Sequence, residues 1–437
     1  MATQLQLARD RIVTPAMQAV AAAEGVPSEI VRAEVAAGRA VIPANPAHTA
    51  LKPAVAGRAF RTKINANLGR STERSSIPEE LEKVRVALCA GADFLMDLSV
   101  GPDLAALRRA ILAACPAPLG TVPIYEAFCR AGSDVARLTG DILLDVIREQ
   151  AEQGVDFMTL HTGLLKAHVP LATRRKMGIV SRGGSILAEW MVQHDRENPL
   201  YERWDEILRL CARHDVTVSL GDGLRPGCLA DASDEAQFAE LDALGALVRR
   251  CRDAGVQVMV EGPGHVPFDQ IQMNVEREQR VCDQAPFYVL GPVVTDVAPG
   301  YDHITSCIGA TAAAYYGAAL LCYVTPAEHL GLPTADEVRR GIVAYRIAAH
   351  AADVARRLPR AREWDDAMAD ARMNFDWDRQ FSLAIDGPAA RARYEAGRDP
   401  SAGEADHCSM CGREFCAVRT SRRLKEKAAE RAENARP

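Results

Sequence analysis

The stretch Val216-Thr-Val-Ser-Leu220-Gly-Asp222-Gly-Leu-Arg225 decides the fold, because it joins a strand-like run to a polar loop. A short apolar run that is rich in β-branched residues and bounded by turn residues is typical of a buried strand in a parallel sheet. Asp222 and Arg225 place a carboxylate and a guanidinium directly after this strand. Arg225 is either a fork-shaped donor for an anion or a solvated residue of a capped turn.

Runs of this kind occur eight times, with longer helical patterns between them, as in repeated βα units. They span residues 94–98, 120–125, 156–161, 177–181, 216–220, 257–261, 287–290 and 320–324. Eight parallel strands with intervening helices are what a (β/α)8 barrel requires. We therefore predict an α/β fold, with a catalytic TIM-type barrel at 76–355 and a small N-terminal cap region at 1–75. Residues 356–437 form a third region, which is first helical and then continues through a flexible linker at 397–404 to a group of cysteines.

Nearly every unusual polar motif lies at or just after the end of one of these runs. The active sites of such barrels lie at the C-terminal ends of the strands, so we expect these motifs to converge on one mouth. They are Met96-Asp-Leu-Ser99, Tyr125, His161-Thr-Gly163, Ser181-Arg182-Gly183-Gly184, Asp222-Gly223-Leu224-Arg225, Glu261-Gly-Pro-Gly-His265, Tyr288 and Thr325-Pro-Ala-Glu-His329.

The motif Ser181-Arg182-Gly183-Gly184 precedes a helical pattern and resembles an anion cradle more than a simple turn. The chain has a formal net charge of -6. Two arginines at the mouth of an acidic protein indicate an anionic substrate.

Cys408, Cys411 and Cys416 lie within nine residues near the end of the chain. A cubane iron–sulfur cluster normally takes four thiolates, so three leave one iron open to bind a reactant. A zinc knuckle that also uses His407 is the alternative, whereas a ferredoxin-like carrier would need a fourth cysteine nearby. The other nine of the 12 cysteines are scattered, which does not fit a disulfide framework.

His265 and His329 each follow a strand-like run and have turn residues beside them. Lone histidines are more often structural than ligands, and this spacing is not specific for a metal. If they do share Zn²⁺ or Fe²⁺, two imidazoles leave positions open for substrate or water, as in a catalytic site.

Composition is that of an ordinary globular protein, with 48% hydrophobic and 25% charged residues. We expect a cytoplasmic protein with no nucleic-acid partner, since cysteine use is sparse and the net charge is negative. The uncharged stretch 304–327 is long enough to span a bilayer, but its sequence is more typical of a buried helix that leads into a buried strand. No membrane partner is therefore predicted.

Long segments resemble the phosphomethylpyrimidine synthase family of radical S-adenosylmethionine (SAM) enzymes. Among them are Lys63-Ile-Asn-Ala-Asn67, Val180-Ser-Arg-Gly-Gly184, Ser219 to Gly227, Glu261 to Pro267, Ala298 to Ser306 and Cys322 to Pro333, together with the cysteine trio. The resemblance covers nearly the whole chain.

The resemblance implies a [4Fe–4S] cluster on Cys408, Cys411 and Cys416 that binds SAM. The implied reaction converts 5-aminoimidazole ribotide into 4-amino-5-hydroxymethyl-2-methylpyrimidine phosphate for thiamin, with formate, carbon monoxide, 5′-deoxyadenosine and methionine as co-products. The family's metal ligands map onto His265 and His329, and Glu261 becomes a catalytic residue. The implied partners are a second subunit in a homodimer and an electron donor such as flavodoxin or ferredoxin. Ribotide contacts map onto Asn67, Met96, Tyr125, His161, Ser181, Arg182, Gly183, Asp222, Gly223, Leu224, Arg225, Glu261 and Tyr288.

Two other functions stay open at this point. The related 5-hydroxybenzimidazole synthase uses the same ribotide and makes a cobamide precursor, although Asp222 to Arg225 and Pro286-Phe-Tyr288 look more like the pyrimidine synthase. A barrel protein that binds zinc and has no turnover is the non-enzymatic alternative.

Overall fold

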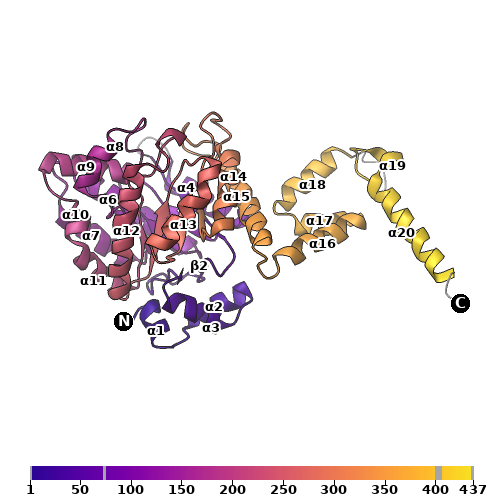
Figure 1. Ribbon diagram of the computed structural model, residues 1–437, viewed down its shortest axis with the longest axis horizontal. Coiled ribbons are helices and arrows are strands. Elements are labelled where there is room, and N and C mark those ends of the chain that lie inside the picture. Colours follow the sequence, from indigo (N-terminus) through magenta and orange to yellow (C-terminus); the bar gives the residue numbers. More distant parts are fainter. Residues whose placement is uncertain (1, 72–74, 399–405, 435–437) are drawn as a thin grey trace. The chain divides into compact units, whose positions relative to one another are not determined.

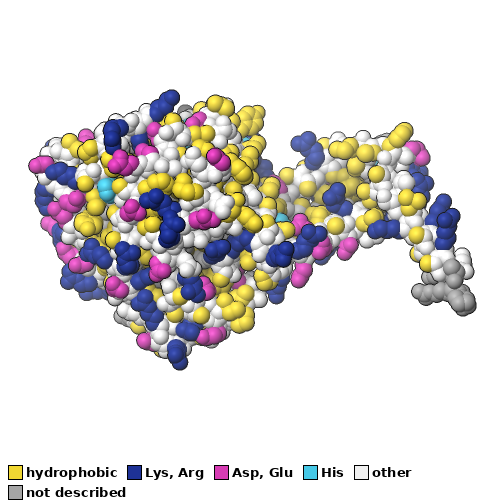
Figure 2. All heavy atoms as spheres, viewed as in Figure 1, with side chains coloured by type: hydrophobic (Ala, Val, Ile, Leu, Met, Phe, Trp, Pro, Cys, Tyr) yellow, Lys and Arg dark blue, Asp and Glu magenta, His cyan; other side chains and the backbone are white. Residues whose placement is uncertain are grey.

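The computed structural model describes residues 2–71, 75–398 and 406–434 (Figure 1). The chain divides into two compact units, Met1–Arg356 and Arg357–Pro437. The linker predicted before the cysteines lies largely outside the described residues. On the face drawn in Figure 2, basic and acidic side chains are interspersed over the first unit.

The first unit contains a closed barrel of eight parallel strands in the order β10-β3-β4-β5-β6-β7-β8-β9, which confirms the predicted TIM-type barrel. Each strand is short and almost entirely buried, as expected where helices cover the outside and side chains fill the inside. The strands are β3 Lys63–Leu68, β4 Phe94–Asp97, β5 Leu119–Thr121, β6 Phe157–Leu160, β7 Thr217–Leu220, β8 Val258–Gly262, β9 Phe287–Leu290 and β10 Leu320–Cys322.

Helices surround the barrel, and several begin with a side chain that accepts a hydrogen bond from the first turn, as at Thr139, Asp234 and Thr334. The longer helices of this layer are α4 Ile77–Ala90, α5 Leu104–Ala114, α6 Pro123–Arg130, α7 Gly140–Gln153, α9 Arg182–His194, α11 Trp204–His214, α12 Glu235–Asp253, α13 Ile271–Val281, α14 Asp302–Tyr316 and α15 Ala335–Ala355. The shorter ones are η1 Lys166–His168, α8 Val169–Ala172, α10 Pro199–Glu202, η2 Leu229–Asp231 and η3 Phe268–Gln270.

One predicted strand is wrong. Residues 177–181 are irregular, because Gly178 has φ +65° and Met177 is 54% exposed, whereas the barrel strands are buried. The missing strand is β3, which lies within the predicted cap region and pairs with β10 and β4. The hydrophobicity pattern did not reveal β3, because this strand contains polar residues. Its Lys63 is only 1% exposed, and the Lys63 ammonium lies 3.0 Å from Glu24 of the N-terminal region.

The predicted run 120–125 is also too long. Strand β5 ends at Thr121, and Pro123 then starts helix α6, where the missing N–H of proline costs nothing. Tyr125 therefore lies in the first turn of a helix rather than at a strand end.

The N-terminal region contains α1 Gln4–Arg9, α2 Pro15–Glu24 and α3 Ser28–Ala36, with a two-stranded antiparallel ribbon of β1 Ala40–Val41 and β2 Ala56–Gly57. It packs at the amino ends of the barrel strands. Thr3 Oγ1 donates to the carbonyl of Gly255 at 2.5 Å, and the N–H of Gln4 donates to Asp215 Oδ2 at 2.9 Å. Loops that follow the strands form the opposite end of the barrel, where the strands end.

The second unit is helical, with α16 Ala361–Met373, α17 Trp377–Leu383, α18 Gly387–Ala396, α19 Gly412–Phe415 and α20 Ala417–Asn434. Its aromatic residues form a small cluster in which the ring of Trp377 stacks on that of Tyr394, with centroids 4.2 Å apart. None of the 12 cysteines, all of which lie in described residues, forms a disulfide. Among the described residues, no helix is long and apolar enough to cross a membrane; the stretch 304–327 forms most of α14 and then β10.

Gly120 in β5 tests how tightly the barrel interior is packed. A Cβ at this position would lie 2.2 Å from the Phe157 ring, on the neighbouring strand. We expect Gly120→Ala to lower the free energy of unfolding by about 1–3 kcal/mol, because the ring must leave its rotamer. Denaturant unfolding measures this change. The matched control is Gly331→Ala, where nothing lies within 4 Å of the new Cβ; equal stability of the two variants would contradict the prediction.

Candidate active site at the barrel mouth

A single cavity at the carboxyl ends of the strands brings eight of the predicted site residues together. Strands β3, β4, β6, β8, β9 and β10, the loop after β7, and helix α6 contribute its walls. The predicted residues that line it are Asn67, Met96, Tyr125, His161, Asp222, Arg225, Glu261 and Tyr288. An adjoining cavity of about 450 Å³ shares Asn67, Tyr125 and Arg225 and adds Arg182. Together they form a mouth of the size that small-molecule ligands occupy.

Sequence reasoning missed two residues of this site: Cys322, which lines the floor of the cavity, and Asn65, which bonds to a lining residue. Asn65 Nδ2 donates to the hydroxyl of Tyr288 at 2.7 Å, and that hydroxyl donates to Met96 Sδ at 3.3 Å. Asn67 Nδ2 donates to Cys322 Sγ at 3.0 Å, and burial raises the pKa of this thiol to about 12, so it stays protonated. Cys322 lies in the middle of the predicted strand 320–324, and the observed strand β10 ends at this residue.

Glu261 lies at the end of β8 and faces the cavity. Its Oε1 accepts hydrogen bonds from Thr159 Oγ1 at 2.6 Å and Ser219 Oγ at 3.0 Å, so residues of β6 and β7 orient it. Burial raises the pKa of Glu261 above its ordinary value and outweighs these hydrogen bonds and the nearby Arg225. A buried carboxyl group that hydroxyl donors orient in this way is suited to take up or give a proton.

Asp222 and Arg225 form an ion pair, with Arg225 Nη1 3.1 Å from Asp222 Oδ1. Burial raises the pKa of Asp222 to about 7, although Arg225 works against this shift. Oδ2 of Asp222 has no hydrogen-bond partner within the part of the chain that the structure describes. Arg225 is therefore held at the cavity. This position favours a donor for an anion over a solvated residue of a capped turn.

His161 is a neutral residue between the two glycine-rich loops. Burial, together with the charge of Arg225, lowers the pKa of His161 to about 3. Its Nε2 lies 3.1 Å from the hydroxyl of Ser181. That hydroxyl also accepts from the N–H of Gly184 and so begins helix α9.

The two glycines after Arg182 are required by close packing. A Cβ on Gly183 would lie 2.5 Å from the His161 ring, and one on Gly184 would lie 2.4 Å from the carbonyl of Gly223. The loop 181–184 thus packs directly against the loop 222–225. Arg182 stays exposed at the first turn of α9, with its guanidinium carbon 4.8 Å from the centroid of the Tyr125 ring.

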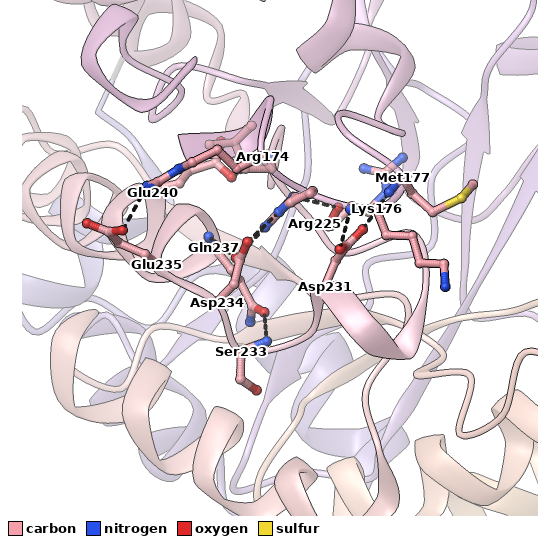
Figure 3. Close-up of polar contacts among 12 residues, drawn as sticks. Arg174, Lys176, Met177, Arg225, Asp231, Ser233, Asp234, Glu235, Gln237 and Glu240 are labelled. Atoms are coloured by element: carbon pink, nitrogen blue, oxygen red, sulfur yellow. Dashed lines mark hydrogen bonds and ion pairs between the residues drawn. The ribbon is translucent and has the colours of Figure 1, made fainter. Parts of the chain in front are cut away.

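A partly buried set of polar contacts joins the segments that flank these two loops (Figure 3). Asp234 accepts two hydrogen bonds from Arg175, at 2.7 and 2.6 Å. The two oxygens of Asp231 accept from the backbone N–H groups of Lys176 and Met177, each at 2.8 Å. We call Arg175, Asp231 and Asp234 the loop brace. Its effect is to hold the segment that leads to Arg182 against the segment that follows Arg225.

His265 and His329 lie together beside this site, with ring centroids 5.3 Å apart. His265 Nδ1 is 2.8 Å from Asp296 Oδ1, and His329 Nδ1 is 3.6 Å from Asp302. The hydrogen bond between His265 Nδ1 and Asp296 leaves the other ring nitrogen of His265 available, which is the usual arrangement around a metal-binding histidine. The described residues nevertheless contain no group of three or more histidine, cysteine or acidic side chains placed to hold a metal ion.

The three cysteines lie in the second unit, around the short helix α19. Cys411 precedes its first residue and Cys416 follows its last, and Cys416 is the buried member of the trio. His407, the fourth ligand of the zinc alternative, has its Nδ1 3.1 Å from Asp406 Oδ1.

The fold and the cavity are those of the TIM-barrel class, in which active sites lie at the carboxyl ends of the strands. Residues 3–423 match the Radical SAM ThiC family, and the chain belongs to this family. Its relatives named phosphomethylpyrimidine synthase include proteins of Halobacterium salinarum and Natronomonas pharaonis, each 60% identical. The first alignment covers 96% of this chain and 88% of the relative, and the second covers 98% and 89%.

Among solved structures, a dihydropteroate synthase from Xanthomonas albilineans aligns with 73% of this chain and 100% of its own at 14% identity and a TM-score of 0.43.

The loop brace can be tested by its stability. Arg175→Ala leaves Asp234 without its two charged hydrogen bonds, and we expect a loss of about 2 kcal/mol in unfolding free energy. The side chain of Arg175 is 2% exposed. Arg174 and Glu235 join the same segments, but their side chains are 66% and 72% exposed, so Arg174→Ala should cost less than about 0.5 kcal/mol. Denaturant unfolding compares the two variants, and equal losses would show that the brace contributes nothing beyond a surface pair.

Proposed function

We propose that this chain is the thiamin pyrimidine synthase of its cell, converting 5-aminoimidazole ribotide into 4-amino-5-hydroxymethyl-2-methylpyrimidine phosphate. SAM is consumed, and formate, carbon monoxide, 5′-deoxyadenosine and methionine are the co-products. The observation that supports this most is the cavity, because eight side chains predicted to contact the ribotide line one space. Membership of the radical SAM family supports the same chemistry.

The cationic side of the mouth is suited to the phosphate of the ribotide. Arg182 at the start of α9 and Arg225 after β7 both line the larger cavity. A guanidinium keeps its charge and matches a phosphate with two parallel hydrogen bonds. The hydroxyl of Ser181 and the backbone of Gly183 lie at the same helix start, where backbone N–H groups favour an anion.

The opposite side of the cavity is suited to the aminoimidazole ring. Asn67, Tyr288 and the neutral His161 offer hydrogen-bonding groups without a fixed charge, and Met96 and Tyr125 give apolar surface. Glu261 and Asp222 supply carboxyl groups with raised pKa values, which hold or release protons as the ring is rebuilt. Leu224 and Gly223 position the loop that carries Arg225.

We further propose that Cys408, Cys411 and Cys416 hold a [4Fe–4S] cluster. Their thiolates fit such a group, since soft sulfur ligands select iron–sulfur clusters, and the described sequence after Cys416 contains no fourth cysteine. When bound, the reduced cluster with SAM supplies the 5′-deoxyadenosyl radical. The protein must exclude other C–H bonds and water from such a species.

His265 and His329 are proposed to bind one Zn²⁺ or Fe²⁺ through their other ring nitrogens. The two imidazoles and the carboxylates behind them fit this role. We also infer a cytoplasmic homodimer that receives electrons from a flavodoxin or ferredoxin.

The test is an anaerobic incubation of the purified protein with reductant, SAM and the ribotide, followed by mass analysis. The hydroxymethylpyrimidine phosphate and 5′-deoxyadenosine are the expected products. Formation of 5-hydroxybenzimidazole would overturn the assignment of the product. A colourless protein that contains zinc alone would overturn the assignment as a radical enzyme.

Cys416→Ala should abolish both the iron–sulfur absorbance and 5′-deoxyadenosine formation, because only two thiolates remain for the cluster. Visible spectra and chromatography of the nucleoside measure the two effects. The control is Cys89→Ala, at an exposed cysteine on α4, which should keep both. Turnover by the Cys416 variant would show that the trio is not the cluster site.

His329→Ala should lower the affinity for the mononuclear metal at least about tenfold, since even the outer partners of metal ligands contribute that much. The visible absorbance of the cluster should remain, because the cysteines are unchanged. Metal analysis after dialysis, beside His214→Ala at the end of α11, measures the effect. Unchanged metal content in the His329 variant would contradict the two-histidine site.

A further inference from the structure

Glu240 is a buried acid directly behind the loop that carries Asp222 and Arg225. It lies on helix α12 and is 2% exposed. Its Oε2 accepts the backbone N–H of Leu224 at 2.7 Å, and this bond anchors the loop. Its Oε1 has no hydrogen-bond partner within residues 2–71, 75–398 and 406–434, and Oδ2 of Asp222 is in the same situation.

A small space lies between Glu240 and the active-site cavity and shares lining residues with that cavity. Its volume is about 20 Å³, which exceeds the 10–15 Å³ that one water molecule needs. Its polar lining offers the partners that a buried water requires, and these are Asp222, Arg225, Gln237, Glu240, Glu261 and Asn274. The same Asp222, Arg225 and Glu261 also line the cavity at the mouth.

We propose that Glu240 exchanges a proton with Asp222 through one water in this space. Asp222 can then be protonated again by the protein while substrate covers the mouth. This inference rests on the proposed function only in taking Asp222 as a group that faces the substrate. Glu240 acts through Asp222, and its place is that of a supporting residue rather than a catalytic one.

The proton balance is simple. After Asp222 has given its proton to the substrate, the water donates one proton to Oδ2 of Asp222 and receives one from Oε1 of Glu240. Asp222 is then neutral again, and Glu240 is a carboxylate that keeps the hydrogen bond from Leu224. The reverse sequence removes a proton from the substrate. No oxidant, reductant or further reactant takes part.

The electrostatic surroundings support this exchange. Burial, with the charge of Asp222 as the next cause, raises the pKa of Glu240 to about 8, close to the value of about 7 for Asp222. Two acids with similar pKa values pass a proton in either direction with little free-energy change. The charged and titratable groups on the surrounding elements include Asp222 and Arg225 after β7, Glu261 on β8, Arg175 after α8, His168 on η1, and Arg277 and Glu278 on α13.

The substitution Glu240→Gln distinguishes proton exchange from loop anchoring. The amide oxygen still accepts the N–H of Leu224, but the amide has no acid proton to exchange. We expect Glu240→Gln to bind the ribotide as the wild type does and to lower the single-turnover rate at least tenfold at pH 7. In the wild type the rate should fall as pH rises through the pKa of Glu240, near 8. This limb should be missing in the variant.

Glu278→Gln is the matched control. Glu278 is also fully buried and without a hydrogen-bond partner among the described residues, and burial raises its pKa well above the ordinary value, but it does not line the small space. This variant should keep the wild-type rate and pH profile.

Infrared spectroscopy gives a readout that needs no turnover. The carbonyl band of a protonated carboxylic acid that titrates near pH 8 should be absent in Glu240→Gln. In Asp222→Asn it should titrate at lower pH, because a negative neighbour is gone. If the wild type shows these bands but makes no product, the proposed function fails and the proton exchange stands.

Three results would overturn the proton exchange. Wild-type rate and pH profile in Glu240→Gln would make Glu240 a purely structural residue. Weaker ribotide binding in that variant would assign it to loop positioning. A band that does not respond to Asp222→Asn would show that the two acids are not coupled.

Discussion

The pairing of β3 with β10 is the constraint on which the rest of the structure depends. It closes the barrel through Leu320 opposite Lys63 and Cys322 opposite Asn65. Closure has a cost, since it buries the ammonium of Lys63, and the carboxylate of Glu24 at 3.0 Å offsets that cost. The N-terminal region is therefore part of the barrel's stability. Because β3 also carries Asn67, the same pairing sets the position of the Cys322 thiol and the amide at the floor of the active site.

Burial determines the charge of the site more than the number of ionisable residues does. It raises the pKa values of Asp222, Glu240 and Glu261 and lowers that of His161, so all four tend toward their neutral forms. The two arginines, 182 and 225, keep their charge because a guanidinium does not lose its proton in proteins. Arg182 and Arg225 thus give the mouth a positive charge that does not titrate, which suits an anionic substrate.

The barrel and most of the cavity could be predicted from sequence because both follow from the period and ends of buried strands. Glu261 comes at a strand end, His161 and Asp222 follow strands closely, and parallel strands all finish on one face. Strand β3 could not be found in this way, since Lys63, Asn65 and Asn67 look like a loop unless their buried partners are known. The prediction of a strand at 177–181 was wrong because apolar side chains in this run are partly exposed instead of buried. The position of Glu240 behind the loop could not be predicted from the sequence, since a helical pattern does not show which acid packs behind a loop.

Asp296 shows how two parts of the site that are separate in sequence are linked physically. One of its carboxylate oxygens lies 2.8 Å from Nδ1 of His265, and the other accepts the N–H of Leu229 at 2.9 Å. Leu229 continues the loop of Asp222 and Arg225, and the loop brace holds that loop against the segment before Arg182. A shift of the loop therefore changes the hydrogen bond that orients the imidazole, and a rotation of the imidazole changes an anchor of the loop. If His265 binds a metal and the loop binds substrate, as proposed, this shared carboxylate couples the two without any motion of the barrel itself.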